Sequence, residues 1–78
     1  TIDWLENRIR VILTEANCDM DMVTSKDQAL LKQDVSKLIK EYESYINWCV
    51  EFNPYALKDI KDFRASKSFW EDFLKEQL

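Results

Sequence analysis

Apolar residues recur along the chain with the spacing of amphipathic helices. In the first segment, from about Ile2 to Met22, they follow one another three or four residues apart: Ile2, Leu5, Ile9, Ile12 and Ala16. This spacing places them on one face of a helix. The next position of the series is Asp19, which is charged, so the apolar stripe ends before it. We expect the turn after this segment to lie between Asn17 and Ser25.

The second segment carries the clearest pattern in the sequence. Apolar and aromatic residues alternate at spacings of four and three: Leu31, Val35, Leu38, Tyr42, Tyr45, Cys49 and Phe52. Three unbroken heptads predict a coiled-coil-like seam. Ile39 and Ile46 widen this seam to the stripe that is typical of a bundle helix.

Capping residues mark where the second and third helices begin. Thr24 or Ser25 can cap the second helix, and Asp27 or Gln28 stands at the position of the capping-box partner. Asn53-Pro54 marks the next boundary, because Asn is a favoured N-cap and Pro a favoured first helical residue. We therefore expect the third helix to begin there.

The third segment has an apolar face with one polar intruder, Lys67. The face consists of Ala56, Ile60, Phe63, Trp70, Leu74 and Leu78. Ser68 and Glu71 form a further capping-box pattern. The sequence therefore leaves open whether the third helix is continuous or broken near residues 65–68.

Three amphipathic segments joined by short turns predict an all-α fold. They comprise about 21, 28 and 25 residues, which corresponds to helices of similar length at about 1.5 Å per residue. Short connections force neighbouring helices to run antiparallel. We expect residues 1–78 to form a single domain, an antiparallel up-down-up three-helix bundle.

The composition is consistent with helices and excludes several kinds of functional site. The 78 residues include no Gly, no His and one Pro. A chain without Gly cannot form a P-loop or a dinucleotide-binding turn, and a chain without His lacks the commonest general base and metal ligand. We expect no enzymatic activity, no metal, no cofactor and no small-molecule substrate.

The two cysteines, Cys18 and Cys49, are expected to be free thiols. In the predicted bundle they lie on the order of 30 Å apart along the axis, whereas a disulfide requires Cα atoms within about 7 Å. Free thiols favour a reducing intracellular compartment, cytoplasmic or nuclear. The apolar runs Val11–Leu13 and Trp48–Val50 are far shorter than the roughly 20 residues of a membrane span.

Charged residues are mixed along the chain, with eleven Lys or Arg against fifteen Asp or Glu. The bases between Lys58 and Lys67 spiral around their helix and are interleaved with acids, so we expect a solvated face and regard nucleic-acid binding as unfavoured. Asp19-Met20-Asp21 resembles the start of a calcium loop, but Thr24 stands where that loop needs Gly. We expect a solvated acidic turn.

The apolar residues left over from the core stripes give the main functional clue. The candidate partner-binding residues are Trp4, Val11, Cys18, Met22, Trp48, Phe69 and Phe73. On the first helix these residues lie opposite the core stripe, and Trp and Met are enriched at protein interfaces. The alternative, that large aromatic residues only wrap the edges of a small core, stays open.

Two functional hypotheses follow from this surface chemistry. The first is a non-catalytic helical protein–protein interaction module, a scaffold or adaptor that forms a homo-oligomer or docks a partner helix on the back face of helix one. The second is a small acidic inhibitor or immunity-type protein that blocks a basic site on an enzyme or nucleic-acid-binding protein. The second would use Glu15, Asp19, Asp21, Glu41, Glu43 and Glu51.

Three short motifs resemble landmarks of spectrin-type three-helix repeats: Trp4-Leu5-Glu6, Leu30-Leu31-Lys32 and the segment Phe69–Leu74. The resemblance implies a scaffold-like three-helix fold. Spectrin repeats are longer, and the spacing from Leu30 to Trp70 is too short for their second and third helices. The chain is therefore not assigned to that family.

Overall fold

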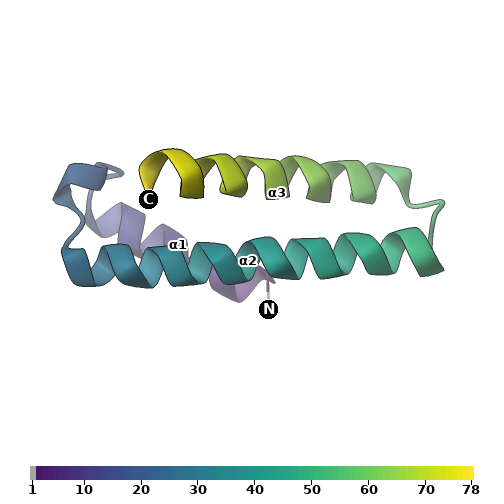
Figure 1. The fold of residues 1–78 in the computed structure, drawn as a ribbon, viewed down its shortest axis with the longest axis horizontal. Coiled ribbons are helices and arrows are strands. Elements are labelled where there is room, and N and C mark those ends of the chain that lie inside the picture. Colours follow the sequence, from purple (N-terminus) through teal and green to yellow (C-terminus); the bar gives the residue numbers. More distant parts are fainter. Residues whose placement is uncertain (1) are drawn as a thin grey trace.

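The computed structural model describes residues 2–78 as a bundle of three α-helices with one short 3-10 helix. The elements are α1 (Ile2–Glu15), η1 (Met20–Met22), α2 (Ser25–Phe52) and α3 (Leu57–Gln77). Figure 1 shows α2 running along the whole molecule, with α1 and α3 antiparallel to it. The predicted all-α, up-down-up arrangement is confirmed.

The three helices differ in length more than the sequence pattern predicts. α1 has 14 residues, α2 has 28 and α3 has 21. The expectation of similar lengths is therefore wrong for the first helix. In Figure 1, α1 lies along the half of α2 that is next to the first turn, and its N-terminal end stops near the middle of α2.

α1 is short because the chain leaves the helical conformation soon after Glu15. Asn17 and Cys18 have φ values of 54° and 58°, in the left-handed region. The N–H of Cys18 donates to the carbonyl of Leu13 at 2.7 Å, and that of Asn17 donates to Thr14 at 3.0 Å. This is a Schellman motif, in which Asn17 replaces the usual Gly. The predicted turn is confirmed, but extending the first helix to Met22 is wrong.

Thr24 begins α2, as one of the two N-cap candidates predicts. Its Oγ1 accepts a hydrogen bond from the backbone N–H of Asp27 at 3.2 Å. Ser25 is the first residue of the helix. The side chain therefore satisfies one of the N–H groups that the first turn of a helix leaves without a partner.

The connection between α2 and α3 differs from the prediction. Asn53 caps the C-terminus of α2, where its N–H donates to the carbonyl of Cys49 at 2.8 Å. The N–H of Ala56 donates to the carbonyl of Asn53 at 3.1 Å, which closes a turn with Pro54 at its second position. The expected start of helix three at Asn53-Pro54 is wrong, because Pro also favours this turn position and α3 begins at Leu57.

α3 is continuous from Leu57 to Gln77, so the break considered near residues 65–68 does not form. Trp70, Leu74 and Leu78 pack against the same core as Phe63. Keeping these side chains on one face requires an unbroken helix through Ser68, and that packing outweighs the local capping-box signal.

Most residues of the predicted stripes form the core. The buried apolar residues are Leu5, Ile9, Ala16, Leu31, Val35, Leu38, Tyr42, Ile46, Cys49 and Ile60. Two positions of the heptad seam, Tyr45 and Phe52, are exposed, and Ile46 is buried near them. An α-helix has 3.6 residues per turn, so heptad positions rotate by about 20° per heptad unless the helix supercoils.

Two polar contacts join α1 to α2 at the edge of this core. The Nε of Arg8 lies 3.3 Å from Oδ2 of Asp34, whose side chain is only 5% exposed. Asp34 Oδ2 makes no hydrogen bond, so the pair is held by charge attraction. The hydroxyl of Tyr42 donates a hydrogen bond to Glu6 Oε1.

No helix within residues 2–78 combines the length and the apolar content that crossing a bilayer requires.

Candidate partner-binding cleft

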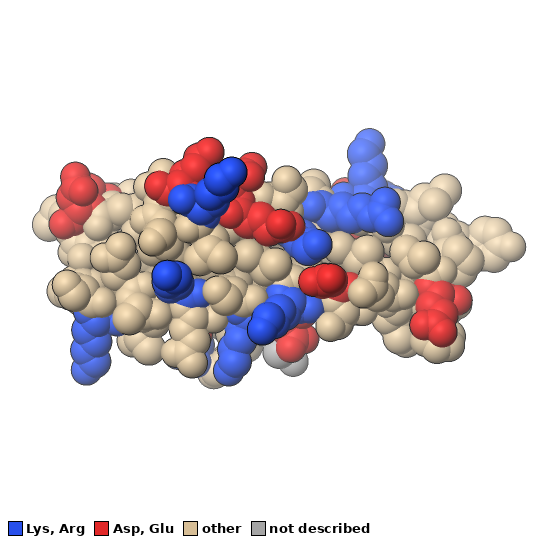
Figure 2. Space-filling model, viewed as in Figure 1, with Lys and Arg blue, Asp and Glu red and all other residues tan. Residues whose placement is uncertain are grey.

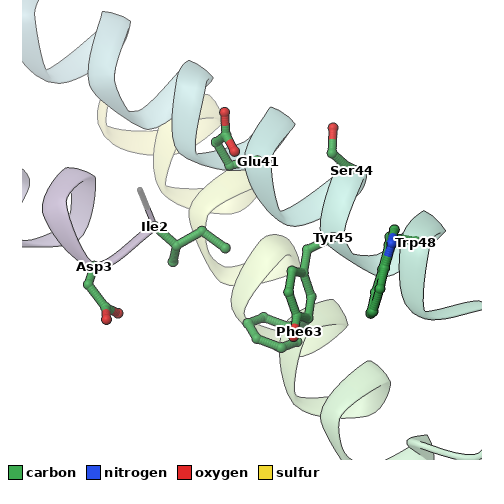
Figure 3. Close-up of a pocket in the computed structure, with 7 residues that line it drawn as sticks. All are labelled: Ile2, Asp3, Glu41, Ser44, Tyr45, Trp48 and Phe63. Atoms are coloured by element: carbon green, nitrogen blue, oxygen red, sulfur yellow. The ribbon is translucent and has the colours of Figure 1, made fainter. Parts of the chain in front are cut away.

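A cleft opens between α2 and α3 where α1 stops. It is lined by Ile2 and Asp3 of α1, by Phe63 of α3, and by four residues of α2: Glu41, Ser44, Tyr45 and Trp48. We call this feature, about 540 Å³ in volume, the aromatic cleft (Figure 3). Since Ile2 and Asp3 form one end, the aromatic cleft continues the groove in which α1 lies.

Aromatic rings make up the apolar wall of the aromatic cleft. The ring centroids of Tyr45 and Phe63 lie 4.6 Å apart, and those of Tyr45 and Trp48 lie 6.1 Å apart. Phe52 continues this row, with its centroid 5.8 Å from that of Trp48. Tilted contacts at these separations are favourable for aromatic pairs. The aromatic side chains of α2 and α3 therefore pack against one another along the wall of the cleft.

These rings stay open to solvent in spite of their mutual contacts. Trp48 is 52% exposed, Tyr45 is 42% exposed and Phe52 is 66% exposed. Tyr55 and Leu57, in and just after the turn between α2 and α3, are more exposed still. Exposed apolar side chains thus occur both along the aromatic cleft and at the turn between α2 and α3.

The charged side chains that line the aromatic cleft, Asp3 and Glu41, are both acidic. The groove on the opposite side of the α2–α3 pair is different, because Arg64 and Lys67 line it together with acids. The described lining of the aromatic cleft includes no Lys or Arg.

The structure places the predicted partner-binding residues of the first segment on two different elements. Trp4 and Val11 lie exposed on α1, beside a shallow hollow that also includes Arg8. Cys18 and Met22 are exposed in the connection that follows, because α1 ends at Glu15. The expected continuous back face on helix one is therefore wrong in its second half.

Trp4 also has an intramolecular role. The guanidinium carbon of Arg8 lies 4.7 Å from the centroid of the Trp4 ring, a cation–π contact. Arg8 also pairs with Asp34, and the side chain of Arg8 is 41% exposed while that of Asp34 is 5% exposed. The guanidinium of Arg8 therefore contacts both Trp4 and Asp34.

The other three predicted residues lie in three different surroundings. Trp48 lines the aromatic cleft. Phe69 is 61% exposed on α3 and stands edge-on to Trp70. Phe73 is half-buried and packs against the main core, so counting it as left over from the core is wrong.

The sequence pattern assigned Tyr45 and Phe63 to the core and so did not name them as site residues. The assignment is wrong for Tyr45, which is 42% exposed, whereas Phe63 packs against both core clusters and also lines the aromatic cleft. The sequence signal for the end of α1 at Glu15 is Asn17, since Asn is the usual substitute for Gly at a helix C-terminus.

The acids of the inhibitor hypothesis do not form one patch. Glu15, Asp19 and Asp21 lie at or near the first turn, whereas Glu51 lies near the second turn at the other end of α2. Glu41 lines the aromatic cleft and Glu43 lines the opposite groove. Figure 2 shows acidic and basic side chains interspersed on the face that it draws.

The two thiols are free in the structure, Cys18 exposed and Cys49 buried. Over residues 2–78, the structure brings together no group of three or more Cys, Asp or Glu side chains suited to hold a metal ion.

Comparisons with protein-family models, with curated proteins and with solved structures found no match to this chain.

Proposed function

We propose that the protein is a non-catalytic helical interaction module that binds a protein partner through the aromatic cleft. The observation that carries the proposal is the row of Tyr45, Trp48 and Phe52, each more than 40% exposed although in contact with its neighbour. Single exposed apolar residues are normal, but contiguous apolar surface on a small domain is typical of an interaction site. Trp and Tyr are also the residue types that contribute most to binding energy at interfaces.

A protein partner fits the cleft better than a nucleic acid does. Asp3 and Glu41 line the aromatic cleft and would repel phosphate groups. Aromatic rings and carboxylates together suit a peptide surface that carries apolar and basic side chains. The free thiols, Cys18 and Cys49, support our proposal that the module works in a reducing intracellular compartment.

Two other surfaces are weaker candidates for the same role. On the back face of α1, Trp4 already contacts Arg8, and Val11 is left as a small apolar area. The acidic-inhibitor alternative has its carboxylates divided between both ends and opposite grooves of the molecule. Neither surface offers the contiguous aromatic area of the aromatic cleft.

The test compares two equivalent substitutions of exposed aromatic residues. Trp48→Asp changes the aromatic cleft, and Phe69→Asp makes the same kind of change on α3 outside it. In quantitative pull-downs from an extract of the cells that make the protein, Trp48→Asp should lose a specific partner that the wild type and Phe69→Asp retain. Sedimentation of the purified chain shows separately whether that partner is a second copy.

Circular dichroism should first confirm that both variants keep the helical content of the wild type. If a folded Trp48→Asp variant retains the same partners as the wild type, and the wild type sediments as a monomer, the proposal is wrong. Loss of partners only with Trp4→Asp and Val11→Asp would move the interface to the back face of α1.

A further inference from the structure

The outer surface of α1 carries a second concave feature, separate from the aromatic cleft. We call it the α1 hollow. It has a volume of about 360 Å³ and is lined by Trp4, Asn7, Arg8, Val11 and Ile12. It shares no lining residue with the aromatic cleft. The five residues recur at helical spacings of three and four, so a single helix presents the whole hollow.

Two contacts hold the side chain of Arg8 in place within the α1 hollow. Its Nε lies 3.3 Å from Oδ2 of the buried Asp34, and its guanidinium carbon lies 4.7 Å from the centroid of the Trp4 ring. A carboxylate and an aromatic ring on the same guanidinium restrict a side chain that is otherwise flexible. The α1 hollow therefore presents an arginine whose orientation is fixed before a ligand binds, which lowers the entropic cost of binding.

Arg8 retains hydrogen-bond donors for a ligand. A guanidinium has five N–H groups, and the pair with Asp34 uses the one on Nε. Within residues 2–78 the structure describes no hydrogen bond from the side chain of Arg8, which is 41% exposed. The exposed amide of Asn7 adds a donor beside it. The α1 hollow is thus an apolar surface with donors at its centre.

From these observations we propose that the α1 hollow binds an Asp or Glu side chain of a partner protein, at a point where apolar residues flank that side chain. Arginine pairs with a carboxylate through two parallel hydrogen bonds. Trp4 and Val11, which are 57% and 56% exposed, would contact the apolar neighbours. Trp and Arg are residue types that contribute most to binding energy at interfaces. This site is independent of the proposed function, because the α1 hollow and the aromatic cleft have different linings.

The order of the residues along α1 favours a side chain within a segment over the carboxylate of a chain end. Trp4 and Val11 are seven residues apart, about 10 Å along the helix, and Arg8 stands between them. A carboxylate bound to Arg8 therefore has apolar surface on both sides along the helix axis. An Asp or Glu inside a segment can have apolar neighbours on both sides, whereas a C-terminal carboxylate has them on one side only.

The charge of the α1 hollow favours a carboxylate over a phosphate. Arg8 is the one base in the described lining, and the carboxylate of Asp34 offsets part of its charge. Surfaces that bind phosphate groups gather several Lys and Arg side chains. The described lining includes no Asp or Glu that would repel an acidic side chain. A single guanidinium, already paired on one side, thus suits one group with a single negative charge.

The experiment selects peptides from a display library in which the central position is Glu, Gln or Lys. The positions on both sides of it are drawn from apolar residues. Selection is run in parallel on the wild type, on Arg8→Lys and on Arg10→Lys. Both variants keep the net charge, but Arg8 lines the α1 hollow, whereas Arg10 lies outside the lining and its side chain is 70% exposed. Circular dichroism should first confirm that both variants keep the helical content of the wild type.

We expect Glu to be enriched over Gln and Lys on the wild type and on Arg10→Lys. On Arg8→Lys that enrichment should fall, because Lys keeps a charge beside Asp34 but lacks the fork of donors that binds a carboxylate. The best peptide is then titrated in solution, where each of the three Trp side chains gives one indole N–H signal in NMR spectra. The Trp4 signal should shift most, and Trp4→Ala should weaken binding at least about tenfold.

Trp48→Asp is the control that separates the α1 hollow from the aromatic cleft, and it should leave the affinity of the selected peptide unchanged. Four outcomes would overturn the inference. The first is that no peptide is selected above background on the wild type. The second is that Gln or Lys is selected as often as Glu. The third is that Arg8→Lys and Arg10→Lys have equal effects. The fourth is that Trp48→Asp abolishes binding, which would assign the peptide to the aromatic cleft.

Discussion

The side chain of Tyr42 joins all three helices. It lies on α2, its hydroxyl donates to Glu6 of α1, and its ring centroid lies 5.7 Å from that of Phe63 on α3. Burial and the hydrogen bond to the Glu6 carboxylate raise the pKa of Tyr42 to about 12. Both effects favour the neutral phenol over the phenolate in the folded state.

Stability at high pH should depend on Tyr42. The pKa in the folded state is raised from the ordinary value of 10.0 to about 12, so the folded state holds the proton to higher pH than the unfolded state does. The stabilisation is fully present below about pH 10 and is lost as the pH rises through about 12. We expect this stabilisation to be about 1–2 kcal/mol. The free energy of unfolding of Tyr42→Phe should therefore not show the corresponding decrease at high pH.

Urea unfolding of the wild type and Tyr42→Phe between pH 8 and about 12 measures this difference, since the other titrating groups are common to both. At neutral pH the substitution should cost about 1 kcal/mol, because it removes one hydrogen bond. Tyr55→Phe is the matched control, as Tyr55 is 92% exposed. Parallel curves for the wild type and Tyr42→Phe would contradict the prediction.

The burial of Asp34 could be predicted from the sequence, but its ion-pair partner could not. It stands three residues after Leu31 and four before Leu38, so helical spacing already places it on the core stripe. Asp34 is absent from the predicted core because apolar residues alone defined the stripe. Its partner, Arg8, could not be identified without the register of α1 against α2, and that register is a tertiary property.

At the scale of the elements, the ends of the helices are where sequence signals succeeded or failed. The Thr24 cap is local, because its Oγ1 and the Asp27 N–H are three residues apart, and it was one of the two caps that the sequence predicted. The start of α3 was predicted wrongly, since Asn53-Pro54 is compatible both with a helix start and with a turn. Packing between α2 and α3 decides between two such local solutions.

Removing the Thr24 cap should destabilise the protein measurably. Thr24→Ala leaves the N–H of Asp27 without its side-chain acceptor and should cost about 1 kcal/mol. Thermal unfolding should then show a midpoint lower by roughly 4–8 °C for a domain of this size. Ser25→Ala, one residue later, is the matched control and should change stability by less than about 0.5 kcal/mol. Equal effects of the two substitutions would show that Thr24 is not the cap that stabilises α2.

For the whole molecule, the short α1 divides the bundle into two unequal ends. The main core contains residues of α1, α2 and α3, whereas the second cluster is smaller and built from α2 and α3 alone. Sections with few buried apolar contacts open locally at a lower free energy than global unfolding requires. We therefore expect the end that carries the aromatic cleft to be the less stable end.

Native-state hydrogen exchange tests this expectation along α2. Amides near Leu31–Tyr42 should exchange only through global unfolding, whereas those near Ile46–Phe52 should exchange through a smaller opening. A protein partner bound in the aromatic cleft should slow exchange in the second group selectively. Uniform protection along the whole of α2 would contradict the division into two ends.

The sequence by itself determined the helical class, the antiparallel order and most of the core. Residues such as Leu5, Ile9 and Leu38 are spaced by helical periodicity, which depends only on neighbours along the chain. The absence of Gly favours helices, and the short turns require neighbouring helices to run antiparallel. These features depend on local physical chemistry, and they were predictable for that reason.

Only the tertiary structure decided which aromatic residues lie at the surface. Tyr45 and Phe63 both follow the core pattern of their helices, but Tyr45 is 42% exposed in the aromatic cleft, whereas Phe63 packs against both core clusters. A residue on a core stripe is buried only if another helix covers it. Coverage depends on the lengths and registers of helices far apart in sequence, and periodicity within one helix does not determine those.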